Sequence, residues 1–516
     1  MHPTQHTMAF RTGELKRFLS HGAIYAAGAM LARVVSFLMM PIYTRALSPA
    51  QYGVVDLLDT TAGVIFNLAN VAITYSVMRF YYDEPEGKAR GRVVSTAMWG
   101  LFGFGIAAIA CTWPMARPLS VALFHSPEYT LALQLMAITA VFYGLIEVPM
   151  TYIRALERPG LYFAVSVGRL ILGLALNLLL VVWLEMGVMG VVYANILTCL
   201  ITVIALAAFT FRRTGFGISQ RVLRGMVRFG LPFIPGSLAM LVLHNGDRYI
   251  LNRFRPLAEV GIYSLGYKLG MIITYAISVP FANVWSTRMY TVVKEPGGME
   301  TYAKVTTYFV YTLLFAWLGL SALAPEVVQV AASREFAGAA MVVPIIAGGY
   351  AMREAAECWK NAFMIQKRTA VIGWMQPVIA GANVAITWVL VQRAGALGAA
   401  WSTLLTFLLM LGLTTVLAER VMPTPVRFAR VLGAVSIALG IVAASRLVPS
   451  GSLLLATCMK LVLVAAFPLL LVVARVLPPS DRDAIGRSIQ AVKKRLGRAS
   501  NAPSEPLART TTSLNP

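Results

Sequence analysis

The sequence predicts an all-α polytopic membrane protein with about 14 transmembrane helices. Fourteen apolar stretches follow one another with short connections, and each is close to the ~20 residues that cross a bilayer. Hydrophobic residues make up 58% of the 516 residues, and charged residues make up 13%. A chain of this composition acts inside or across a membrane. The predicted spans are 21–43, 54–78, 93–114, 129–153, 161–184, 187–211, 230–251, 260–285, 305–324, 339–365, 371–391, 397–417, 429–447 and 452–475.

The distribution of Lys and Arg predicts the orientation. If the N-terminus is cytoplasmic, 30 of the 44 basic residues fall in cytoplasmic segments, seven in the opposite loops and seven inside spans. This is the positive-inside pattern, and it predicts an even number of spans with both termini cytoplasmic. Contact with anionic lipid headgroups explains the net charge of +22, so we expect membrane lipids and no nucleic acid as partners.

An internal repeat divides the predicted core. Arg45 to Gly53 and Arg253 to Gly261 both read Arg, seven residues, then Gly. Both loops fall on the same predicted side of the membrane, as a parallel repeat of six spans requires. The predicted parts are a cytoplasmic segment 1–20, an N-lobe 21–211 with spans 1–6, a cytoplasmic linker 212–229, a C-lobe 230–417 with spans 7–12, two extra C-terminal spans in 429–475, and a tail 476–516. In that tail we expect a basic amphipathic helix on the inner membrane surface, followed by disorder.

A polar stripe runs along the second span. Its members recur at helical spacing over about 27 Å, at ~1.5 Å per residue. They are Asp56, Asp59, Gly63, Asn67, Asn70 and Thr74. Facing lipid, each Asp would cost ~2.5 kcal/mol or more at the bilayer centre, so the stripe must face protein or water. A hydrogen-bonded helix seam is one alternative; the two carboxylates favour the other, a water-filled cavity.

Seven basic residues lie inside spans, where cations are expensive and therefore are candidates for function. They are Arg33, Arg169, Arg248, Lys268, Arg353, Lys360 and Lys460. Of these we expect four to hold an anionic group in a central cavity: Arg33, Arg169, Arg248 and Lys268. Asp247 and Tyr275 join the second-span stripe as predicted cavity-lining residues. The tenth span carries a charged cluster of Arg353, Glu354, Glu357 and Lys360. This cluster is either a structural ion-pair network or a functional site.

Four residues are candidates for ion coupling: His244, Asp247, Glu147 and Glu357. His244 and Asp247 lie one turn apart, as a proton-coupling pair would. Helix packing, with Asp247 balancing Arg248, is the favoured alternative. Gly and Pro residues at 230–236, and Pro280, predict bends in spans 7 and 8. The four cysteines show no metal-type spacing and no nucleotide-binding or protease motif is present, so we expect no metal, no cofactor and no enzymatic activity.

Two stretches carry more specific signatures. Ala26-Ala27-Gly28 through the segment 41–53 reads as an apolar helix, a small-residue loop and then Tyr-Gly; residues 247–253, running to 261–263, contain an Asp-Arg element in the seventh span. Together they resemble the Wzx-type polysaccharide and O-antigen flippases of the multidrug/oligosaccharidyl-lipid/polysaccharide (MOP) exporter superfamily. The resemblance implies two lobes of six helices arranged in a V, around a cavity lined chiefly by helices 1, 2, 7 and 8.

The resemblance also implies a function: transfer of an undecaprenyl-diphosphate-linked oligosaccharide across the bacterial inner membrane by alternating access, for cell-surface polysaccharide synthesis. Polysaccharide polymerase and export proteins are then candidate partners. One departure matters, because many Wzx-type proteins look twelve-spanned, whereas the related lipid II flippases have 14 spans, like this chain. Lipid II flipping therefore remains an alternative, as does an ion-coupled multidrug exporter of the MATE type. The short outer loops disfavour an enzyme acting on the same lipid carrier.

Overall fold

The computed structural model describes residues 37–449 and 453–477, and every regular element in these ranges is a helix. The predicted all-α class is confirmed. The chain divides into two compact units, Met1–Pro425 and Val426–Pro516. Three predictions lie outside the described residues: most of the first span with Arg33, the amphipathic helix of the tail, and the disordered end.

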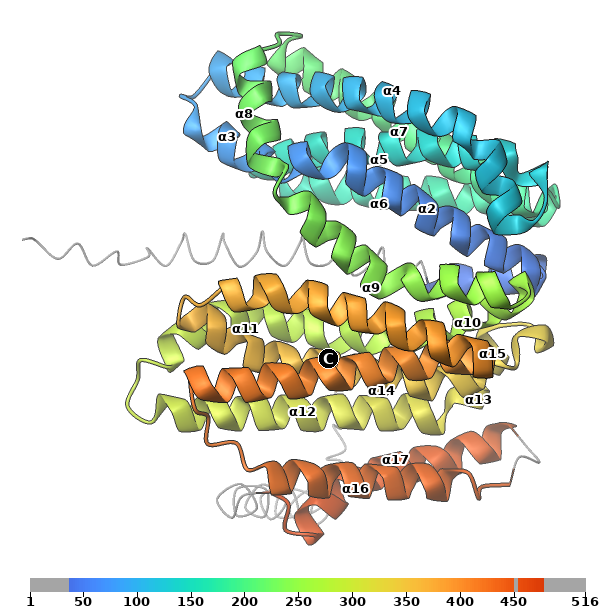
Figure 1. Cartoon of the computed structure of the whole chain (residues 1–516), viewed down its shortest axis with the longest axis vertical. Coiled ribbons are helices and arrows are strands. Elements are labelled where there is room, and N and C mark those ends of the chain that lie inside the picture. Colours follow the sequence, from blue (N-terminus) through green and yellow to red (C-terminus); the bar gives the residue numbers. More distant parts are fainter. Residues whose placement is uncertain (1–36, 450–452, 478–516) are drawn as a thin grey trace, which may run out of the picture. The chain divides into compact units, whose positions relative to one another are not determined.

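The N-terminal half of the first unit consists of helices that gather in one bundle (Figure 1). Residues 37–46 are helical, and then come α2 (Pro49–Thr74), α3 (Val77–Asp83), α4 (Lys88–Phe124), the 3-10 turn η1 (Pro127–Tyr129), α5 (Thr130–Ala155), α6 (Pro159–Asn177), the π-helix η2 (Leu178–Trp183), α7 (Gly187–Thr214) and α8 (Gln220–Gly230). Local sequence sets several of these boundaries. Pro159 opens α6 and Ser219 caps α8 by accepting a hydrogen bond from the Val222 amide, as expected for these residues at helix N-termini.

The C-terminal half of the same unit is a second group of helices (Figure 1). It contains α9 (Phe233–Phe254), α10 (Leu257–Gly270), the π-helix η3 (Thr274–Ser278), α11 (Val279–Val292), α12 (Gly298–Ala322), α13 (Ala324–Ala331), the 3-10 turn η4 (Arg334–Phe336), α14 (Ala339–Ile365) and α15 (Ala370–Val421). Gly395 interrupts α15 with φ 54° and ψ −131°. Glycine adopts such a positive φ without the usual steric cost, and the break falls between the two spans predicted there. The second unit contains α16 (Phe428–Ser445) and α17 (Leu453–Val473).

The part of the chain that the structure describes contains fewer recognisable membrane-spanning helices than the 14 spans that the sequence predicts. Among the described residues, nine helices are long and apolar enough to cross a membrane, or up to 11 if each of two bent helix pairs counts as one span. The 52-residue α15 counts once in that number although it holds two predicted spans. α14 coincides with the predicted span 339–365, but its four charged side chains reduce its hydropathy. The total of 14 therefore stays a prediction.

The bend predicted in the seventh span is confirmed, and the eighth span contains a π-helix where a bend is predicted. The axis turns by 48° between α8 and α9, beside Pro232. The eighth predicted span, 260–285, is not one continuous α-helix, because η3 separates α10 from α11. Pro280 lacks the amide hydrogen that an α-helix would donate to the carbonyl of residue 276, and the amide of Val279 instead bonds the Thr274 carbonyl across a wider turn.

α2 and α10 pack backbone to backbone. A Cβ atom added at Gly53 would collide with the Leu257 carbonyl, and one added at Gly261 would collide with the Pro49 carbonyl. Each added Cβ would also lie 3.0 Å from the backbone nitrogen of the other glycine. Gly53 and Gly261, like Pro49 and Leu257, are related by the 208-residue offset found in the sequence repeat. The contact is therefore reciprocal, as expected where two related helices meet across a pseudo-twofold axis.

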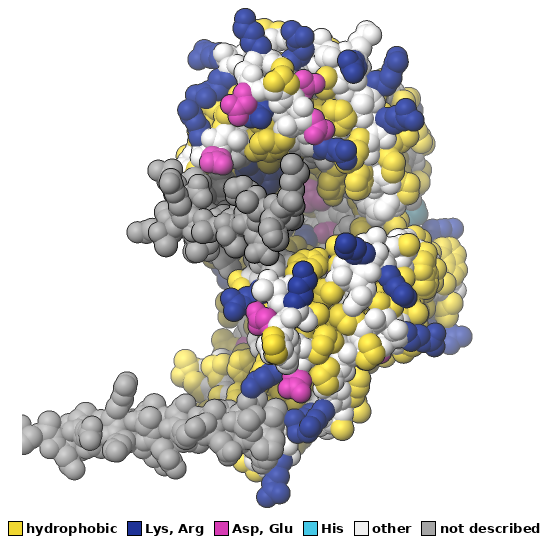
Figure 2. All heavy atoms as spheres, turned by 90° about the vertical axis from the view of Figure 1, so that its left-hand side faces the viewer, with side chains coloured by type: hydrophobic (Ala, Val, Ile, Leu, Met, Phe, Trp, Pro, Cys, Tyr) yellow, Lys and Arg dark blue, Asp and Glu magenta, His cyan; other side chains and the backbone are white. Residues whose placement is uncertain are grey.

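One end of the helices carries many basic side chains. α3, α8 and the connection between α11 and α12 lie at this end of the first unit (Figure 1). Figure 2 views the same end, and Lys and Arg side chains are spread over it. The segments found here are those that the charge distribution predicts to be cytoplasmic.

Candidate functional site

Asp56 lies at the centre of a buried ion cluster that joins α2 to α9 and α10. Its Oδ2 accepts hydrogen bonds from Arg248 Nε at 2.6 Å and from Ser264 Oγ at 2.7 Å. Its Oδ1 lies 2.8 Å from Lys268 Nζ. One carboxylate therefore meets two cations, and both cations come from the C-terminal half of the unit. Buried charges are tolerated when they are paired and hydrogen-bonded in this way.

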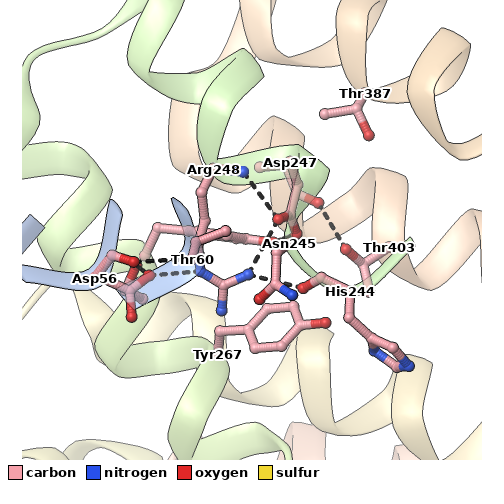
Figure 3. Close-up of polar contacts among 12 residues, drawn as sticks. Asp56, Thr60, His244, Asn245, Asp247, Arg248, Tyr267, Thr387 and Thr403 are labelled. Carbon is pink, nitrogen blue, oxygen red and sulfur yellow. Dashed lines mark hydrogen bonds and ion pairs between the residues drawn. The ribbon is translucent and has the colours of Figure 1, made fainter. Parts of the chain in front are cut away.

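Arg248 is committed to protein partners on every side. Besides Asp56, its Nη1 contacts Asp247 Oδ1 at 3.2 Å and the His244 carbonyl at 2.8 Å. Its guanidinium lies 4.3 Å from the centre of the Tyr267 ring, and its side chain is 4% exposed. Figure 3 shows Asp56, Asp247 and Tyr267 surrounding this guanidinium. Arg248 is thus placed to organise the cluster, with little surface left for a ligand.

Lys268 is the more accessible cation of the pair. Its side chain is 36% exposed, against 6% for the Asp56 side chain that it contacts. The ammonium also donates a hydrogen bond to Tyr52 Oη at 3.3 Å and lies 4.8 Å from the centre of that ring. An ammonium has three donors, and here it faces a cavity while remaining anchored to Asp56.

That cavity has a volume of about 450 Å³ and lies between α2, α9, α10, η3 and α14. We call it the central cavity. Three cations, Arg248, Lys268 and Arg353, reach its wall, and two carboxylates do so. The full lining is Asp56, Asp59, Thr60, Gly63, Leu241, His244, Asn245, Arg248, Tyr267, Lys268, Met271, Thr274, Tyr275, Tyr350 and Arg353. Asp59 is exposed here. Arg248 and Arg353 are also paired with Asp247 and Glu354, so Lys268, which has the most exposed side chain of the three cations, is the one best placed to meet an anionic ligand.

The two candidate ion-coupling residues of α9 do not bond to each other. His244 Nδ1 lies 3.0 Å from Tyr350 Oη, and that hydroxyl lies 2.7 Å from Tyr267 Oη. Asp247 accepts a hydrogen bond from the Tyr263 hydroxyl and pairs with Arg248. These contacts agree with the packing alternative for Asp247. A role of either residue in ion coupling stays a prediction.

The polar stripe of the second span divides into two parts. From Asp56 to Gly63 it lines the central cavity. Farther along, Asn67 donates a hydrogen bond to the Gly63 carbonyl at 2.9 Å and is not among the cavity-lining residues. Asn70 is fully buried and donates to the Phe66 carbonyl at 3.1 Å and, against α5, to the Ala140 carbonyl at 3.4 Å. Asn70 thus lies in a helix seam and, like Asn67 and Asp247, is not among the residues that line the cavity in this structure; that these residues line it stays a prediction.

The other predicted residues lie in two further cavities. Arg169 and Glu147 line a cavity of about 440 Å³ within the N-terminal helices, and Arg169 lies 5.0 Å from the centre of the Tyr143 ring. Glu357 lines a cavity of about 820 Å³ within the C-terminal helices, where it forms an ion pair with Lys360. The structure therefore does not gather Arg169 with Arg248 and Lys268. In the described part of the chain, no group of three or more His, Cys, Asp or Glu residues could hold a metal ion.

Sequence reasoning missed the partners that complete the site. Asp56 and Arg248 are 192 residues apart, and Asp56 and Lys268 lie on different helices. Tyr52, Tyr267 and Tyr350 were not considered as site residues. One signal was available for Ser264, because it occupies the position of Asp56 in the 208-residue repeat.

Comparisons with known proteins agree with this architecture. Residues 18–286 match the family described as polysaccharide biosynthesis protein. The lipid II flippase MurJ, in an inward closed conformation, aligns with a TM-score of 0.71 and 9% identity over 86% of this chain and 98% of MurJ. A multidrug resistance MATE transporter of the MOP superfamily, in an inward-facing conformation, aligns with a TM-score of 0.56 and 14% identity over 75% of this chain and 94% of that one. At these identities the likeness shows the fold. No protein of curated function matches the sequence.

Proposed function

The chain belongs to the polysaccharide biosynthesis protein family and has the fold of the MOP exporter superfamily, and on this basis we propose that it flips an undecaprenyl-diphosphate-linked oligosaccharide across the bacterial inner membrane. The observation that carries the proposal is the Lys268 ammonium on the wall of the central cavity, with a side chain 36% exposed. A diphosphate is the charged part of such a lipid. Charge-assisted hydrogen bonds from buried cations are strong enough to hold it away from water.

Lys268 and Arg353 are the proposed contacts for the diphosphate. Lys268 is the accessible member of the Asp56 cluster, with a side chain 36% exposed. Arg353, from α14, reaches the same cavity while one of its nitrogens contacts Glu354 at 2.5 Å. Arg248 is a positioning residue in this proposal. Its side chain is nearly buried, and it holds Asp56 and Asp247 in place without contacting the diphosphate.

Asp56 supplies a link between binding and movement. It is the counter-ion from α2 that Lys268 and Arg248, both from the C-terminal half, share. A bound diphosphate offers those cations a second set of acceptors and so weakens their hold on α2. In the proposed cycle the two halves then rock apart on the outer side, as in alternating access. Differential contact with the two states is what lets a substrate shift such an equilibrium.

The remaining parts of the proposal follow from the membrane topology of the protein and from the chemistry of the substrate. Both termini are cytoplasmic, the prenyl chain stays in lipid, and the glycan crosses within the hydrated interior. Polysaccharide polymerase and export proteins take over the product on the outer face. Flipping of lipid II is a second candidate function, because MurJ has the same fold over nearly its whole length. Ion-coupled export of drugs is a third, on the likeness to MATE transporters.

Replacement of Lys268 tests the proposal. In cells deleted for this chain, wild type should restore surface polysaccharide, whereas K268Q should lower it at least about tenfold, the equivalent of one charge-assisted hydrogen bond. K268R keeps the charge and should retain most of the export. The measurement is surface polysaccharide per unit of membrane-inserted protein, which separates transport from folding.

The matched control is R393Q, because Arg393 is exposed and lines none of the three cavities. Full export by K268Q would remove the assignment of Lys268. Expression of the wild-type protein separates the candidates: rescue of growth after depletion of the cell's lipid II flippase supports the second function, and restored drug resistance without polysaccharide supports the third.

A further inference from the structure

A cavity within the C-terminal helices of the first unit has no assigned role. Its volume is about 820 Å³, and its walls come from α9, η3, α11, α12, α14 and α15. We call it the C-terminal cavity. Thr274 and Arg353 line both this cavity and the central cavity. The two spaces are therefore neighbours, and one elongated ligand can occupy both.

Two buried polar atoms on the wall of this cavity have no hydrogen-bond partner among the described residues. They are Ser278 Oγ and Trp285 Nε1. The two residues are only 5% and 7% exposed. A buried donor without a partner is costly, and the great majority of such groups in proteins are satisfied. Both residues line the C-terminal cavity, but the two atoms themselves have almost no accessible surface, so a polar ligand in that space reaches them only once their side chains turn toward it.

The backbone at Ser278 is unusual in the same place. Residues Thr274–Ser278 form the π-helix η3, which ends one residue before the Val279–Pro280 step. π-turns inserted in α-helices are often found at functional sites, because the wider turn re-aims side chains. Here the turn brings Thr274 and Ser278 to the cavity wall.

Part of the wall is an aromatic surface. The Phe281 and Phe309 rings are stacked with their centres 3.9 Å apart, and the Trp285 ring lies 6.0 Å from Phe281 at an interplanar angle of 25°. Because Phe309 and Trp285 are only 6% and 7% exposed, this cluster presents a small apolar area, which suits a ligand that has both apolar faces and polar edges. A sugar ring has these properties, because its C–H groups form a face and its hydroxyls surround it.

The polar part of the wall is electrically balanced. On α14, Arg353 pairs with Glu354 at 2.5 Å, and Lys360 pairs with Glu357. Glu354 also accepts a hydrogen bond from Thr274 Oγ1 at 2.8 Å. Asn361 and Gln376 add neutral amide groups, which can both donate and accept. Each cation of this wall is paired with a carboxylate of the same helix, so the wall favours a neutral hydroxyl-rich ligand over a phosphate.

We propose that the C-terminal cavity binds the glycan of the lipid-linked substrate while the diphosphate lies at Lys268 in the central cavity. The inference rests on the proposed function and adds the location of the sugar. The half-buried Asn361 and Gln376 contribute hydrogen bonds to hydroxyls, and Trp285 and Ser278 add theirs once their side chains turn toward the bound sugar. Arg353, which reaches both cavities, lies where the diphosphate meets the first sugar.

The test compares two lipids on the purified full-length protein in nanodiscs. One probe is undecaprenyl diphosphate without sugar, and the other is the lipid-linked oligosaccharide that accumulates in cells deleted for this chain. Wild type should bind the oligosaccharide lipid more tightly. W285A and Q376A should each weaken that binding about tenfold, equivalent to the loss of about one hydrogen bond to a ligand, and leave binding of undecaprenyl diphosphate unchanged.

Trp374→Ala is the matched control, because Trp374 is 48% exposed on α15 and does not line the cavity. Gln376 is only half-buried, so Q376A keeps the test decisive even if W285A folds poorly. Variants that keep the wild-type preference for the oligosaccharide lipid would overturn the glycan site while leaving the proposed function intact. If neither lipid binds the wild-type protein, the proposed function fails and the glycan site fails with it.

Discussion

α2 and α10 are the two helices of the sequence repeat that meet in the structure, and they differ in one informative way. Gly53 and Gly261 occupy the same repeat position and contact each other's helix. Three residues farther on, α2 has Asp56 where α10 has Ser264, and these two side chains are hydrogen-bonded. Four residues beyond, α2 has Thr60 where α10 has Lys268. The two helices share the residue that sets their separation and differ in the residues that carry charge.

The difference has a physical reason. Close contact of two backbones requires a residue without a side chain on both helices, so neither glycine can change alone. An ionic contact requires different residues at the equivalent positions of the two helices, because two carboxylates facing each other would repel. An acid on α2 facing cations from α9 and α10 holds the two halves together. The comparison separates a contact of shape from a contact of charge, and each can be altered without the other.

Removal of the shared carboxylate should have the largest effect. D56A leaves the buried Arg248 and the partly exposed Lys268 without their common partner, and loss of one member of a buried ion pair costs about 3–5 kcal/mol. We expect the lowest melting temperature of all variants, measured on purified protein in detergent. D59A is the control, because Asp59 is exposed in the same cavity and has no ion pair among the described residues; its change should stay within about 0.5 kcal/mol.

The shape contact should come next. G53A and G261A each place a methyl group against a backbone carbonyl of the opposite helix, which cannot move aside as a side chain can. Overpacking of this kind costs about 1–3 kcal/mol, and the two variants should destabilise the protein to a similar extent because the contact is reciprocal. On α6, G168A adds a methyl group with no atom within 4 Å and should not lower the melting temperature. A neutral G261A would contradict the reciprocal contact.

A transfer of the acid between the two helices should have the smallest net effect. The double variant D56S/S264D moves the carboxylate to the equivalent repeat position, where the side chains already lie 2.7 Å apart. Because Arg248 and Lys268 remain beside it, we expect the double variant to recover about half or more of the roughly 3–5 kcal/mol lost in D56A. The melting temperatures of D56S, S264D and the double variant form a cycle that measures the recovery. A double variant no more stable than D56S alone would show that the charge position, as well as its presence, matters.

Periodicity and charge pattern predicted the helices with good accuracy. α14 coincides with its predicted span, the break at Gly395 separates two predicted spans, and the bend beside Pro232 lies where Gly and Pro cluster. These features depend on local rules, because the bilayer demands long apolar helices and Gly or Pro interrupts them. The eighth span is the exception, because the π-helix η3 interrupts it. A π-turn has no strong local sequence pattern by which it could be predicted.

The structure places the predicted polar residues in several different places, and their roles stay predictions. Lys268, Arg248, Asp59 and Tyr275 do reach one cavity, whereas Arg169 and Glu357 line two others and Asn70 packs into a helix seam. A charged residue in an apolar span must have an ion-pair or hydrogen-bond partner, or contact water. The hydrophobicity of the sequence does not show which helix supplies that partner.

Residue order alone therefore established a helical membrane protein with a polar interior, a repeat of its halves and a bias in its charges. Those properties follow from the bilayer, which acts on each helix separately. The tertiary structure decided the partners, which are Asp56 with Arg248 and Lys268, and Gly53 with Gly261. It also distributed the predicted site residues among three cavities, where the sequence predicted one central cavity. A contact between residues about 200 positions apart depends on how helices rotate and pack against each other, and that is a property of the assembled bundle.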